Sequence, residues 1–371
     1  MAWEITRRSL LAVAATTQAS AGEVAAPGVV LLHADPARAV PSLDSAGYLQ
    51  GLLDRAHTTA LRKVGARCTV VISSRFYGSE MLIVPDLVDV EMSDDGAYDV
   101  SRADMISGFL VNQTVGTRMK NVRVIGSGQG RQPVNKIEMR AADVRESGCG
   151  IIYAGVRGGL IENCRVENCG GVTGRAPYNG VAGIWLTRGA RDCVVRGNQV
   201  QRCRNGINED NFFHISPSGN EIYQNTVSDC RFGIALDSDA SAKDTTVARN
   251  VVIRCLQSGI DLNKARNARV TQNRVESCGL ENGNSGIWLY GSTSIRAESV
   301  LIEGNTISNS GGYGIKVGSN VLRVEIVGNR CVGNKRNGIA IIGHCELWTI
   351  FENELIGNGL EGVRFDASNF P

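Results

Sequence analysis

One short frame recurs along the C-terminal part of the chain: a glycine, an aliphatic residue, any residue and, in most copies, a second aliphatic residue. It begins at Gly150, Gly183, Gly206, Gly233, Gly259, Gly286, Gly314, Gly338 and Gly362. The aliphatic residues at positions 207, 234, 260, 287 and 315 follow one another at intervals of 27, 26, 27 and 28 residues. Repeats of this period that consist only of short strands and turns predict a parallel β-solenoid.

A second marker, Asn-x-(Val/Ile)-x-x-Cys, lies between the frames. Its copies begin at Asn198, Asn225, Asn250 and Asn273, and a copy with one extra residue begins at Asn163. Each coil of a solenoid rises by one strand spacing, about 4.8 Å, so equivalent residues stack in columns. The cysteines of this marker are therefore predicted to be buried core thiols rather than disulfides, and its asparagines to bond to the turns above and below.

The segment before the repeats has a pattern of its own. Residues 42–64 carry apolar side chains at three- and four-residue spacing and are predicted to form a helix that covers the open edge of the sheet. Short strands are expected at 69–72, 81–84, 88–92 and 122–125. The 44 glycines and the aromatic content of 5% fit a narrow aliphatic core with many turns.

These repeats resemble those of the right-handed parallel β-helix proteins of the pectate lyase superfamily, and the resemblance covers residues 42–371. It implies an all-β chain that forms a single-stranded right-handed parallel β-helix of about a dozen coils with an N-terminal capping helix. The superfamily includes lyases, epimerases, glycoside hydrolases, phage tailspikes and proteins that only bind glycans, so the fold alone does not select an activity.

Residues 1–41 are interpreted as an N-terminal arm or an export signal. Arg7 and Arg8 resemble a twin-arginine signal, and Ala19-Ser20-Ala21 would be its cleavage site. Export would place the protein in the periplasm or outside the cell; without export it would be cytoplasmic or part of a virion. The formal charge of +2 favours neither nucleic acid nor membrane as a partner, and no apolar run is long enough to span a bilayer. The oligomeric state stays open, a homo-oligomer included.

The copy of the frame at Gly206 differs from all the others. Its second aliphatic position holds Glu209, and the neighbours Asn208 and Asp210 are also polar. Three consecutive polar side chains inside a strand cost burial energy, which indicates a functional coil. By the alternation of a strand Glu209 points inward, so either the strand bulges or hydrogen bonds hold a buried carboxyl.

Polar and aromatic residues also occupy the outward positions of the neighbouring frames. These positions are predicted to expose Asn208, Asp210, Asp237, Asp261, Asn263 and Lys264, with Trp185, Arg188, Trp288, Tyr290 and Lys316 beside them. Aromatic rings that flank carboxylates are typical of a polysaccharide groove, since sugar faces stack on rings and acids act at one linkage. The alternative is that these positions are polar because they face solvent and that the tryptophans pack against a loop.

Column geometry brings the acids close together. Asp210 and Asp237 share a column on adjacent coils, which places their carboxyl groups about 5 Å apart. Asp261 lies on a diagonal of about 7–8 Å from Asp237. Two carboxylates at the first spacing would share a proton or bind a hard cation such as Ca²⁺. The first spacing also fits a retaining glycosidase and the second an inverting one, so hydrolysis stays open.

A narrower resemblance concerns Gly206–Asp210. Mannuronan C5-epimerases carry Tyr-Gly-Phe-Asp-Pro-His in this frame, where this chain has Asn208 in place of the aspartate and Asp210 in place of the histidine. Asp237 stands where their second aspartate would be, and Lys264 resembles the lysine base of Ca²⁺-dependent pectate lyases. These resemblances imply a lyase or an epimerase that abstracts the C5 proton of a uronate in a polysaccharide.

In that chemistry a cation neutralises the sugar carboxylate before a base removes the proton. Ca²⁺ held by Asp210 and Asp237 would supply the positive charge; without calcium, Arg188 and Lys264 would supply it. Lys264 or else His214, in the loop after the strand, would be the base. Two alternatives remain: a glycoside hydrolase of the tailspike kind, and a solenoid that binds glycans or has a structural role without catalysis.

Overall fold

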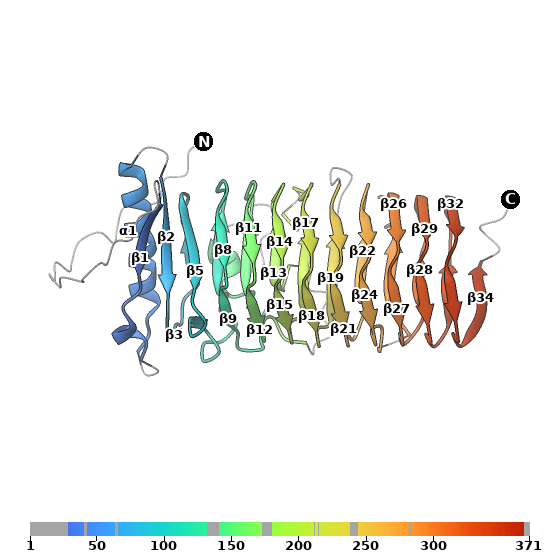
Figure 1. The fold of residues 1–371 in the computed structure, drawn as a ribbon, viewed down its shortest axis with the longest axis horizontal. Coiled ribbons are helices and arrows are strands. Elements are labelled where there is room, and N and C mark those ends of the chain that lie inside the picture. The colour runs from blue at the N-terminus through green and yellow to red at the C-terminus, as the bar shows by residue number, and fades with distance from the viewer. Residues whose placement is uncertain are drawn as a thin grey trace.

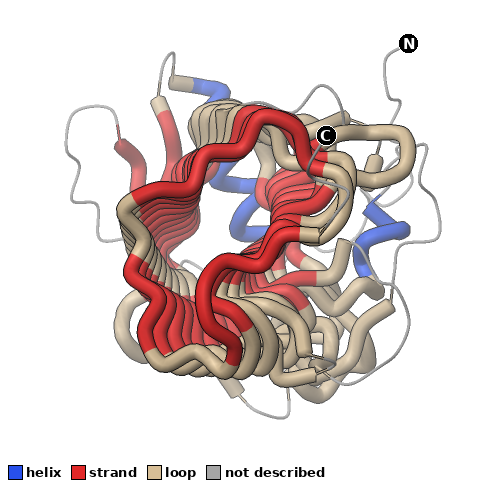
Figure 2. The backbone as a smooth tube through the Cα atoms, turned by 90° about the vertical axis from the view of Figure 1, so that its right-hand side faces the viewer, coloured by secondary structure: helices blue, strands red, loops and turns tan. Residues whose placement is uncertain are grey.

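The computed structural model describes residues 29–40, 43–63, 66–131, 141–172, 180–210, 212–213, 215–237, 244–281 and 283–366. Within these residues the chain forms an elongated parallel β-helix, in which successive coils add strands to three parallel sheets (Figure 1). Viewed along the axis, the strands of each sheet stack behind one another around one continuous core (Figure 2). The all-β, right-handed parallel β-helix predicted from the repeats is confirmed.

The three sheets have 12, 11 and 11 strands, each paired with the equivalent strand of the next coil. Sheet A contains β1 (Val29–His33), β2 (Arg67–Ile72), β5 (Val88–Met92), β8 (Arg118–Lys120), β11 (Leu160–Glu162), β14 (Val194–Arg196), β17 (Glu221–Tyr223), β20 (Thr246–Ala248), β23 (Arg269–Thr271), β26 (Ala297–Glu303), β29 (Val321–Val327) and β32 (Cys345–Phe351). Sheet B contains β3 (Arg75–Tyr77), β6 (Ala97–Asp99), β9 (Arg123–Ile125), β12 (Arg165–Glu167), β15 (Gln199–Gln201), β18 (Thr226–Ser228), β21 (Val251–Ile253), β24 (Arg274–Glu276), β27 (Thr306–Ser308), β30 (Arg330–Val332) and β33 (Glu354–Ile356). Sheet C contains β4 (Leu82–Val84), β7 (Phe109–Asn112), β10 (Ile151–Ala154), β13 (Ala182–Thr187), β16 (Asn205–Asp210), β19 (Phe232–Asp237), β22 (Ile260–Asn263), β25 (Ile287–Tyr290), β28 (Ile315–Val317), β31 (Asn337–Ile341) and β34 (Leu360–Phe365). The helices are η1 (Pro36–Arg38), α1 (Ala46–Arg62) and α2 (Ala141–Arg145).

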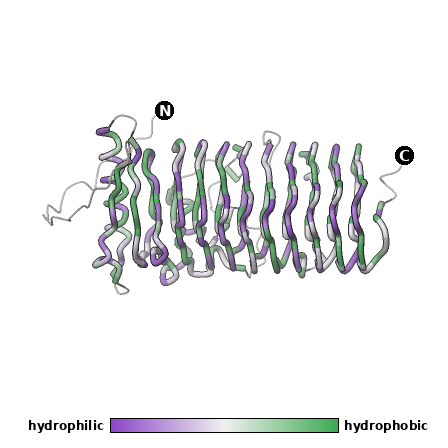
Figure 3. The backbone as a smooth tube through the Cα atoms, viewed as in Figure 1, coloured by the Kyte–Doolittle hydropathy of each residue, from purple (hydrophilic) through white to green (hydrophobic). Residues whose placement is uncertain are grey.

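The recurrent frames build sheet C. Their aliphatic residues, such as Ile207 and Ile234, are fully buried in the core. A Cβ atom on Gly206 would lie 2.2 Å from Val227 Cγ1 and 2.6 Å from the carbonyl oxygen of Gly233. Only glycine fits this corner, because the coils approach one another too closely for a side chain. Figure 3 shows the resulting alternation of hydrophobic and hydrophilic stretches along the coils.

Two sets of polar or weakly polar side chains stack inside the helix. The predicted burial of the marker cysteines is confirmed, and all eleven cysteines of the chain are free thiols. The asparagines form a ladder in which each side-chain amide donates a hydrogen bond of 2.8–3.0 Å to the side-chain oxygen of the next. The ladder consists of Asn198, Asn225, Asn250, Asn273, Asn305, Asn329 and Asn353. It gives these interior amides partners in a core that excludes water.

Helix α1 covers the N-terminal end of the sheets, at the left in Figure 1. Leu49 and Leu53 on its inner face are buried in the main core. Asp44 Oδ1 accepts a hydrogen bond of 3.0 Å from the N–H of Ala46 and thereby caps the first turn. The capping helix predicted at 42–64 is confirmed.

The segment before α1 corrects one predicted boundary. Strand β1 pairs in parallel with β2, so residues 29–33 belong to sheet A and not to an arm that extends to residue 41. This strand escapes sequence analysis because it carries neither the glycine frame nor the Asn–Cys marker. The export signal predicted at Arg7 and Arg8 lies outside the described residues. No helix of the described part is both long and apolar enough to cross a bilayer.

The two ends of the described solenoid differ. Strands β32, β33 and β34 are the last in their sheets, and within the described residues each is paired on one side only. Leu347 and Leu360 are 69% and 52% exposed there, and the rings of Trp348 and Phe365 pack with centroids 4.7 Å apart. One end is thus closed by a helix, whereas the other presents strand edges and apolar side chains.

Candidate functional site

Two columns of outward side chains cross the middle of sheet C, and their alignment is the predicted one. The first column contains Asn208, Ala235, Asp261, Trp288 and Lys316. The second contains Asp210, Asp237, Asn263 and Tyr290. Asp210 and Asp237 are therefore paired on adjacent strands, β16 and β19, as the repeat indicated.

Three of these polar residues are buried, which corrects the prediction that the middle coils expose them. Asn208, Asp210 and Asp261 are 3%, 1% and 5% exposed. Asp210 Oδ1 accepts hydrogen bonds of 3.1 Å from Thr187 Oγ1 and from the N–H of Phe212. Asp210 Oδ2 accepts one of 2.6 Å from Asn208 Nδ2. The carboxyl is thus enclosed by protein groups and does not face solvent. Its burial raises the pKa of Asp210 to about 6, and the bonds from Phe212 and Thr187 oppose this shift.

Trp185 is enclosed as well, so the sugar platform predicted at this position is wrong. Its side chain is fully buried, and its ring lies 6.1 Å from that of Phe212 and 5.8 Å from that of Phe213, measured between centroids. Together with Ile152 and Val181 these rings form a small second core, separate from the one inside the helix. The alternative, that the tryptophan packs against a loop, is confirmed for Trp185.

Asp237 and Lys264 form a half-buried ion pair. Lys264 Nζ lies 2.5 Å from Asp237 Oδ1, which also accepts a hydrogen bond of 3.1 Å from Asn263 Nδ2. Both charged side chains are 15% exposed. Water and salt screen such a pair less than they screen a surface pair, so the two charges bind and orient one another.

Asp261 is the carboxyl best placed for proton transfer. Tyr290 OH donates a hydrogen bond of 3.2 Å to Asp261 Oδ1, and Oδ2 is buried near the hydroxyl group of Ser258. Burial raises the pKa of Asp261 to about 7; the charge of Asp237 adds to the shift and the bond from Tyr290 opposes it. A carboxyl that titrates near neutral pH can take up or release a proton.

Trp288, Tyr290 and Lys316 form the side of the site toward the C-terminus. The ring centroids of Trp288 and Tyr290 are 4.4 Å apart, and Lys316 Nζ lies 4.4 Å from the centroid of Trp288. Burial lowers the pKa of Lys316. Trp288 Nε1 and Asn263 Oδ1 are, like Asp261 Oδ2, buried. These three polar atoms on two neighbouring strands form the polar centre of the cluster.

Two further predicted residues do not join this cluster. Arg188 follows β13, three strands along sheet C from β22, and its Nη1 donates a hydrogen bond of 3.4 Å to Asn112 Oδ1. Its charge is therefore directed toward the N-terminal coils and away from Asp261. His214 lies outside the described residues, so its role as an alternative base stays a prediction.

Glu209 points into the core from a regular strand. β16 pairs with β13 and β19 around this residue, with Glu209 opposite Leu186 and Leu236. Its carboxylate accepts hydrogen bonds of 2.9 Å from Asn220 Nδ2 and 2.8 Å from Thr245 Oγ1. Of the two predicted alternatives, the buried carboxyl held by hydrogen bonds is the correct one, and the bulge is not.

The described residues do not fit the calcium site expected on Asp210 and Asp237. Calcium takes about six to eight oxygen ligands, whereas both oxygens of Asp210 accept hydrogen bonds from protein groups and Asp237 Oδ1 faces Lys264. No group of three His, Cys, Asp or Glu side chains that could hold a metal ion occurs among the described residues.

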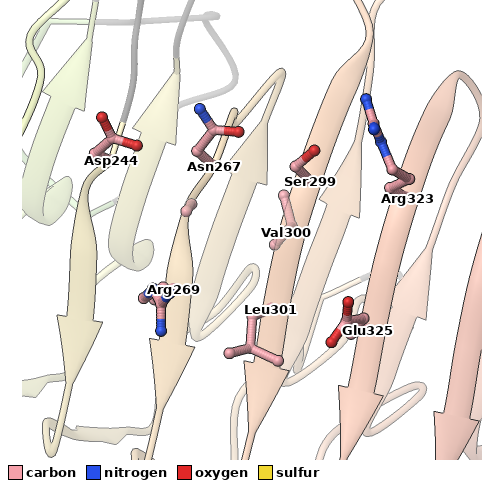
Figure 4. A pocket seen from close by; sticks show the side chains of 9 residues that line it. Asp244, Asn267, Arg269, Ser299, Val300, Leu301, Arg323 and Glu325 are labelled. Carbon is pink, nitrogen blue, oxygen red and sulfur yellow. The ribbon is translucent and has the colours of Figure 1, made fainter.

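A separate groove of about 340 Å³ lies on sheet A across β23, β26 and β29 (Figure 4). Its charged lining residues are Asp244, Arg269, Arg323 and Glu325. Arg323 already pairs with Glu298 at 2.6 Å, and the lining contains no buried polar atom that lacks a partner. The repeat pattern gave no sign of this groove, because outward positions of sheet A are polar in most coils.

Comparison with known proteins gives one family and several structures of the same fold. The family model described as periplasmic copper-binding protein (NosD) matches residues 172–369. Among the curated proteins no relative reaches significance.

Three solved structures illustrate the likeness of fold. The Streptococcus pneumoniae surface protein and adhesin PfbA is 10% identical, with a TM-score of 0.57 over 88% of this chain and 97% of its own. The A-module of the Azotobacter vinelandii mannuronan C-5 epimerase AlgE4 is 13% identical, with a TM-score of 0.53 over 88% and 94%. A mutant of the periplasmic alginate epimerase AlgG is 14% identical, with a TM-score of 0.51 over 91% and 82%. At these identities the likeness shows a shared fold.

Proposed function

For this chain, which belongs to the family described as periplasmic copper-binding protein (NosD), we propose that the outer face of sheet C binds a uronate-containing polysaccharide and abstracts the C5 proton of one sugar. The enzyme would be a lyase or an epimerase. The observation that carries the proposal is Asp261, a buried carboxyl bonded to Tyr290 whose pKa burial raises to about 7, in a cluster that also contains Lys264 and Lys316.

Each side chain of the cluster has a role in this chemistry. Lys316, whose ammonium group is partly removed from water, pairs with the sugar carboxylate and so makes the C5 proton more acidic. Asp261 Oδ2 accepts that proton when the carboxyl is ionised. Trp288 packs against Lys316 and Tyr290 and so orients both groups within the site. Lys264 keeps Asp237 neutralised, so that no second bare carboxylate repels the substrate.

The two reactions differ in where the electron pair of the broken C5–H bond goes. In elimination it forms the C4=C5 double bond, and the oxygen at C4 leaves with a proton. In epimerisation a proton returns to C5 from the opposite face of the sugar. Tyr290 is placed to give the proton to the departing oxygen at C4 in elimination, because its hydroxyl touches Asp261 and because burial raises the pKa of Tyr290 and keeps the group protonated. In epimerisation the proton donor would have to stand on the face of the sugar opposite to Asp261.

Glycoside hydrolysis is a second candidate, favoured by two unlike carboxyl groups on adjacent strands. Leu262 on β22 pairs with Leu236 on β19. Asp261 directly precedes Leu262 and Asp237 directly follows Leu236, so the two acids lie on a diagonal across the two strands. Asp237 is ion-paired with Lys264, whereas burial moves the pKa of Asp261 toward neutrality. Glycosidases use such a difference in pKa between two carboxyl groups: the protonated one acts as the acid, and the ionised one acts as the base or the nucleophile.

The family description also names copper, and the described residues do not fit it. They bring together no three His, Cys, Asp or Glu side chains around one point. The eleven thiols are buried in the core, and burial raises the pKa of Cys149, Cys164 and Cys193 to about 12. No step of the proposed reaction uses copper.

Two observations support an extracytoplasmic glycan as the partner. The family is described as periplasmic, which agrees with the twin-arginine pattern at Arg7 and Arg8. The structures that share this fold include two epimerases of mannuronan or alginate and a surface adhesin. These names support a search among acidic polysaccharides first.

The proposal is tested by incubating the protein with polymannuronate, polyguluronate, polygalacturonate and neutral dextran. Ultraviolet absorbance detects unsaturated ends from a lyase, NMR of the sugar protons detects an epimerase, and a reducing-end assay detects a hydrolase. Asp261→Asn should abolish turnover, whereas the control Asp229→Asn, which changes a surface acid paired with Arg254, should leave it unchanged. If no acidic polymer is modified or bound, the proposed function is wrong.

A further inference from the structure

We propose that Glu209 is a positioning residue for the site on sheet C. The carboxyl group of Glu209 bonds to Asn220, just before β17, and to Thr245, just before β20. These bonds hold β16 in position relative to the starts of β17 and β20. This inference rests on the proposed function, because the site that Glu209 serves is the one assigned above. Glu209 itself lies inside the solenoid and touches no substrate.

Glu209 and the two residues that bond to it are polar at positions where most other coils carry apolar side chains. The residues in the equivalent slot of sheet C are Leu186, Leu236, Leu262, Leu289, Val317 and Ile341. The residues that share one register position of sheet A, from β14 to β29, are Cys193, Asn220, Thr245, Ala268, Val300 and Val324 in turn. The two most polar residues of the second set are the two that bond to Glu209. Three polar side chains that bond to one another at positions that are apolar in other coils indicate a built network.

The network ties three consecutive coils together. Glu209 and Asn220 belong to one coil and Thr245 to the next. Asn220 Oδ1 also accepts a hydrogen bond of 2.9 Å from the N–H of Cys193, and Asn220 Nδ2 donates one of 3.1 Å to the carbonyl oxygen of Ala190 in the preceding coil. All three polar side chains are buried. Such directional bonds set the position of a strand more narrowly than aliphatic contacts do.

The placement of the network connects it to the site. Asn208 and Asp210 flank Glu209 on the opposite face of β16, so the position of the buried carboxylate determines where they stand. Asn220 and Thr245 immediately precede β17 and β20, the strands entered after the chain has left Asp210 and Asp237. The network therefore holds the far ends of both segments whose near ends carry site acids.

Stability alone does not account for a carboxyl in this slot. Replacing a buried polar network by well-packed apolar residues is often neutral or stabilising. The triple variant Glu209→Leu/Asn220→Val/Thr245→Val gives this coil the apolar pattern of the others, but it also removes the acceptor of the Cys193 N–H, so it is expected to unfold at a lower temperature than the wild type and to stay folded at the assay temperature. Its turnover of the acidic polymer should fall by about tenfold to a hundredfold with little change in KM, because misplaced reacting groups lose rate more than binding.

A conservative variant and a matched control complete the kinetic test. Glu209→Gln keeps the volume and one acceptor oxygen, so it should retain more turnover than the triple variant. Ile341→Leu changes the same slot in β31 without removing a polar group and should behave like the wild type. Wild-type turnover in both the triple variant and Glu209→Gln would overturn the positioning role.

Amide hydrogen exchange tests the inference without any substrate. In the triple variant the amides of Phe212 and Thr246, which bond to Asp210 Oδ1 and to the carbonyl oxygen of Asn220, should exchange faster, while those of β28 stay unchanged. Unchanged exchange at both amides would overturn the role of Glu209 whether or not the protein has activity. Absence of wild-type activity on every acidic polymer, with faster exchange as expected, would instead reject the proposed function and keep Glu209 as the residue that positions this surface.

Discussion

A single carboxyl, Asp261, gives the site a pH dependence whose sign follows from its burial. Its pKa is about 7 in the folded protein, above the value of an exposed aspartate. Between about pH 4 and pH 7 the folded state therefore binds more protons than the unfolded state, and the stability contributed by this group is lost as the pH rises through that window. Asp261→Asn cannot ionise, so we expect it to unfold at a higher temperature than the wild type at pH 8 and at a similar temperature at pH 4. Thermal unfolding followed by circular dichroism at both pH values checks this, and an equal difference at both would contradict the raised pKa.

The two tryptophans of sheet C should respond to truncation in opposite ways. Trp185 is fully buried beside Phe212 and Phe213, so Trp185→Ala is expected to cost about 3–5 kcal/mol of unfolding free energy. Trp288 is only half-buried, and Trp288→Ala should weaken binding of the acidic polymer by several-fold, with a smaller loss of stability. Urea unfolding and binding calorimetry on both variants separate the roles. Unchanged binding by Trp288→Ala would show that its ring only packs.

At the scale of elements, an Asn→Ala substitution should lower the unfolding free energy most in the middle of the asparagine ladder. Asn273→Ala leaves donors of Asn250 and the carbonyl oxygen of Val247 without partners in the core, which is expected to cost about 3 kcal/mol. Asn353 stands at the last rung and is half-buried, so Asn353→Ala should cost about 1 kcal/mol because water replaces part of its bonds. Denaturant unfolding measures both; equal losses would mean that the ladder does not act as a continuous stack.

The strands could be predicted from the sequence because the repeat and the alternation are local properties. The repeat predicted that Asp237 lies beside Asp210 in a column, and the alternation predicted that Glu209 points into the core; the structure agrees with both. The burial of Asp210 and Trp185 could not be predicted in this way, because Phe212 and Phe213 cover the strand from a connection that belongs to no repeat. The partners of Glu209 could not be predicted from the sequence either, because Asn220 and Thr245 contact it only across a corner of the solenoid.

At the scale of the whole molecule, the different ends of the solenoid predict a gradient of local stability. α1 buries its apolar face on the first coils, whereas β32, β33 and β34 have strand neighbours on one side only within the described residues. In a repeat protein each coil is stabilised mainly by its neighbours. Backbone amides of the last coils should therefore exchange with solvent faster than those of β16 and β19, as hydrogen-exchange mass spectrometry can show. Protection that is uniform along the axis would contradict this gradient.

The helix that closes only one end also gives the molecule a direction under mechanical load. A pull on the C-terminus would detach the outermost coil first, because the coils behind it and α1 still hold the remainder. The two outermost coils would each release 24 residues, from Ile315 to Ile339 and from Ile339 to Val363, which is an added length of about 80 Å when they are stretched. Every such event also breaks one rung of the asparagine ladder and one strand pairing in each sheet. The force trace would then be a saw-tooth with one peak for each coil, beginning with the coil nearest the C-terminus. The protein would therefore lengthen under tension by one coil at a time.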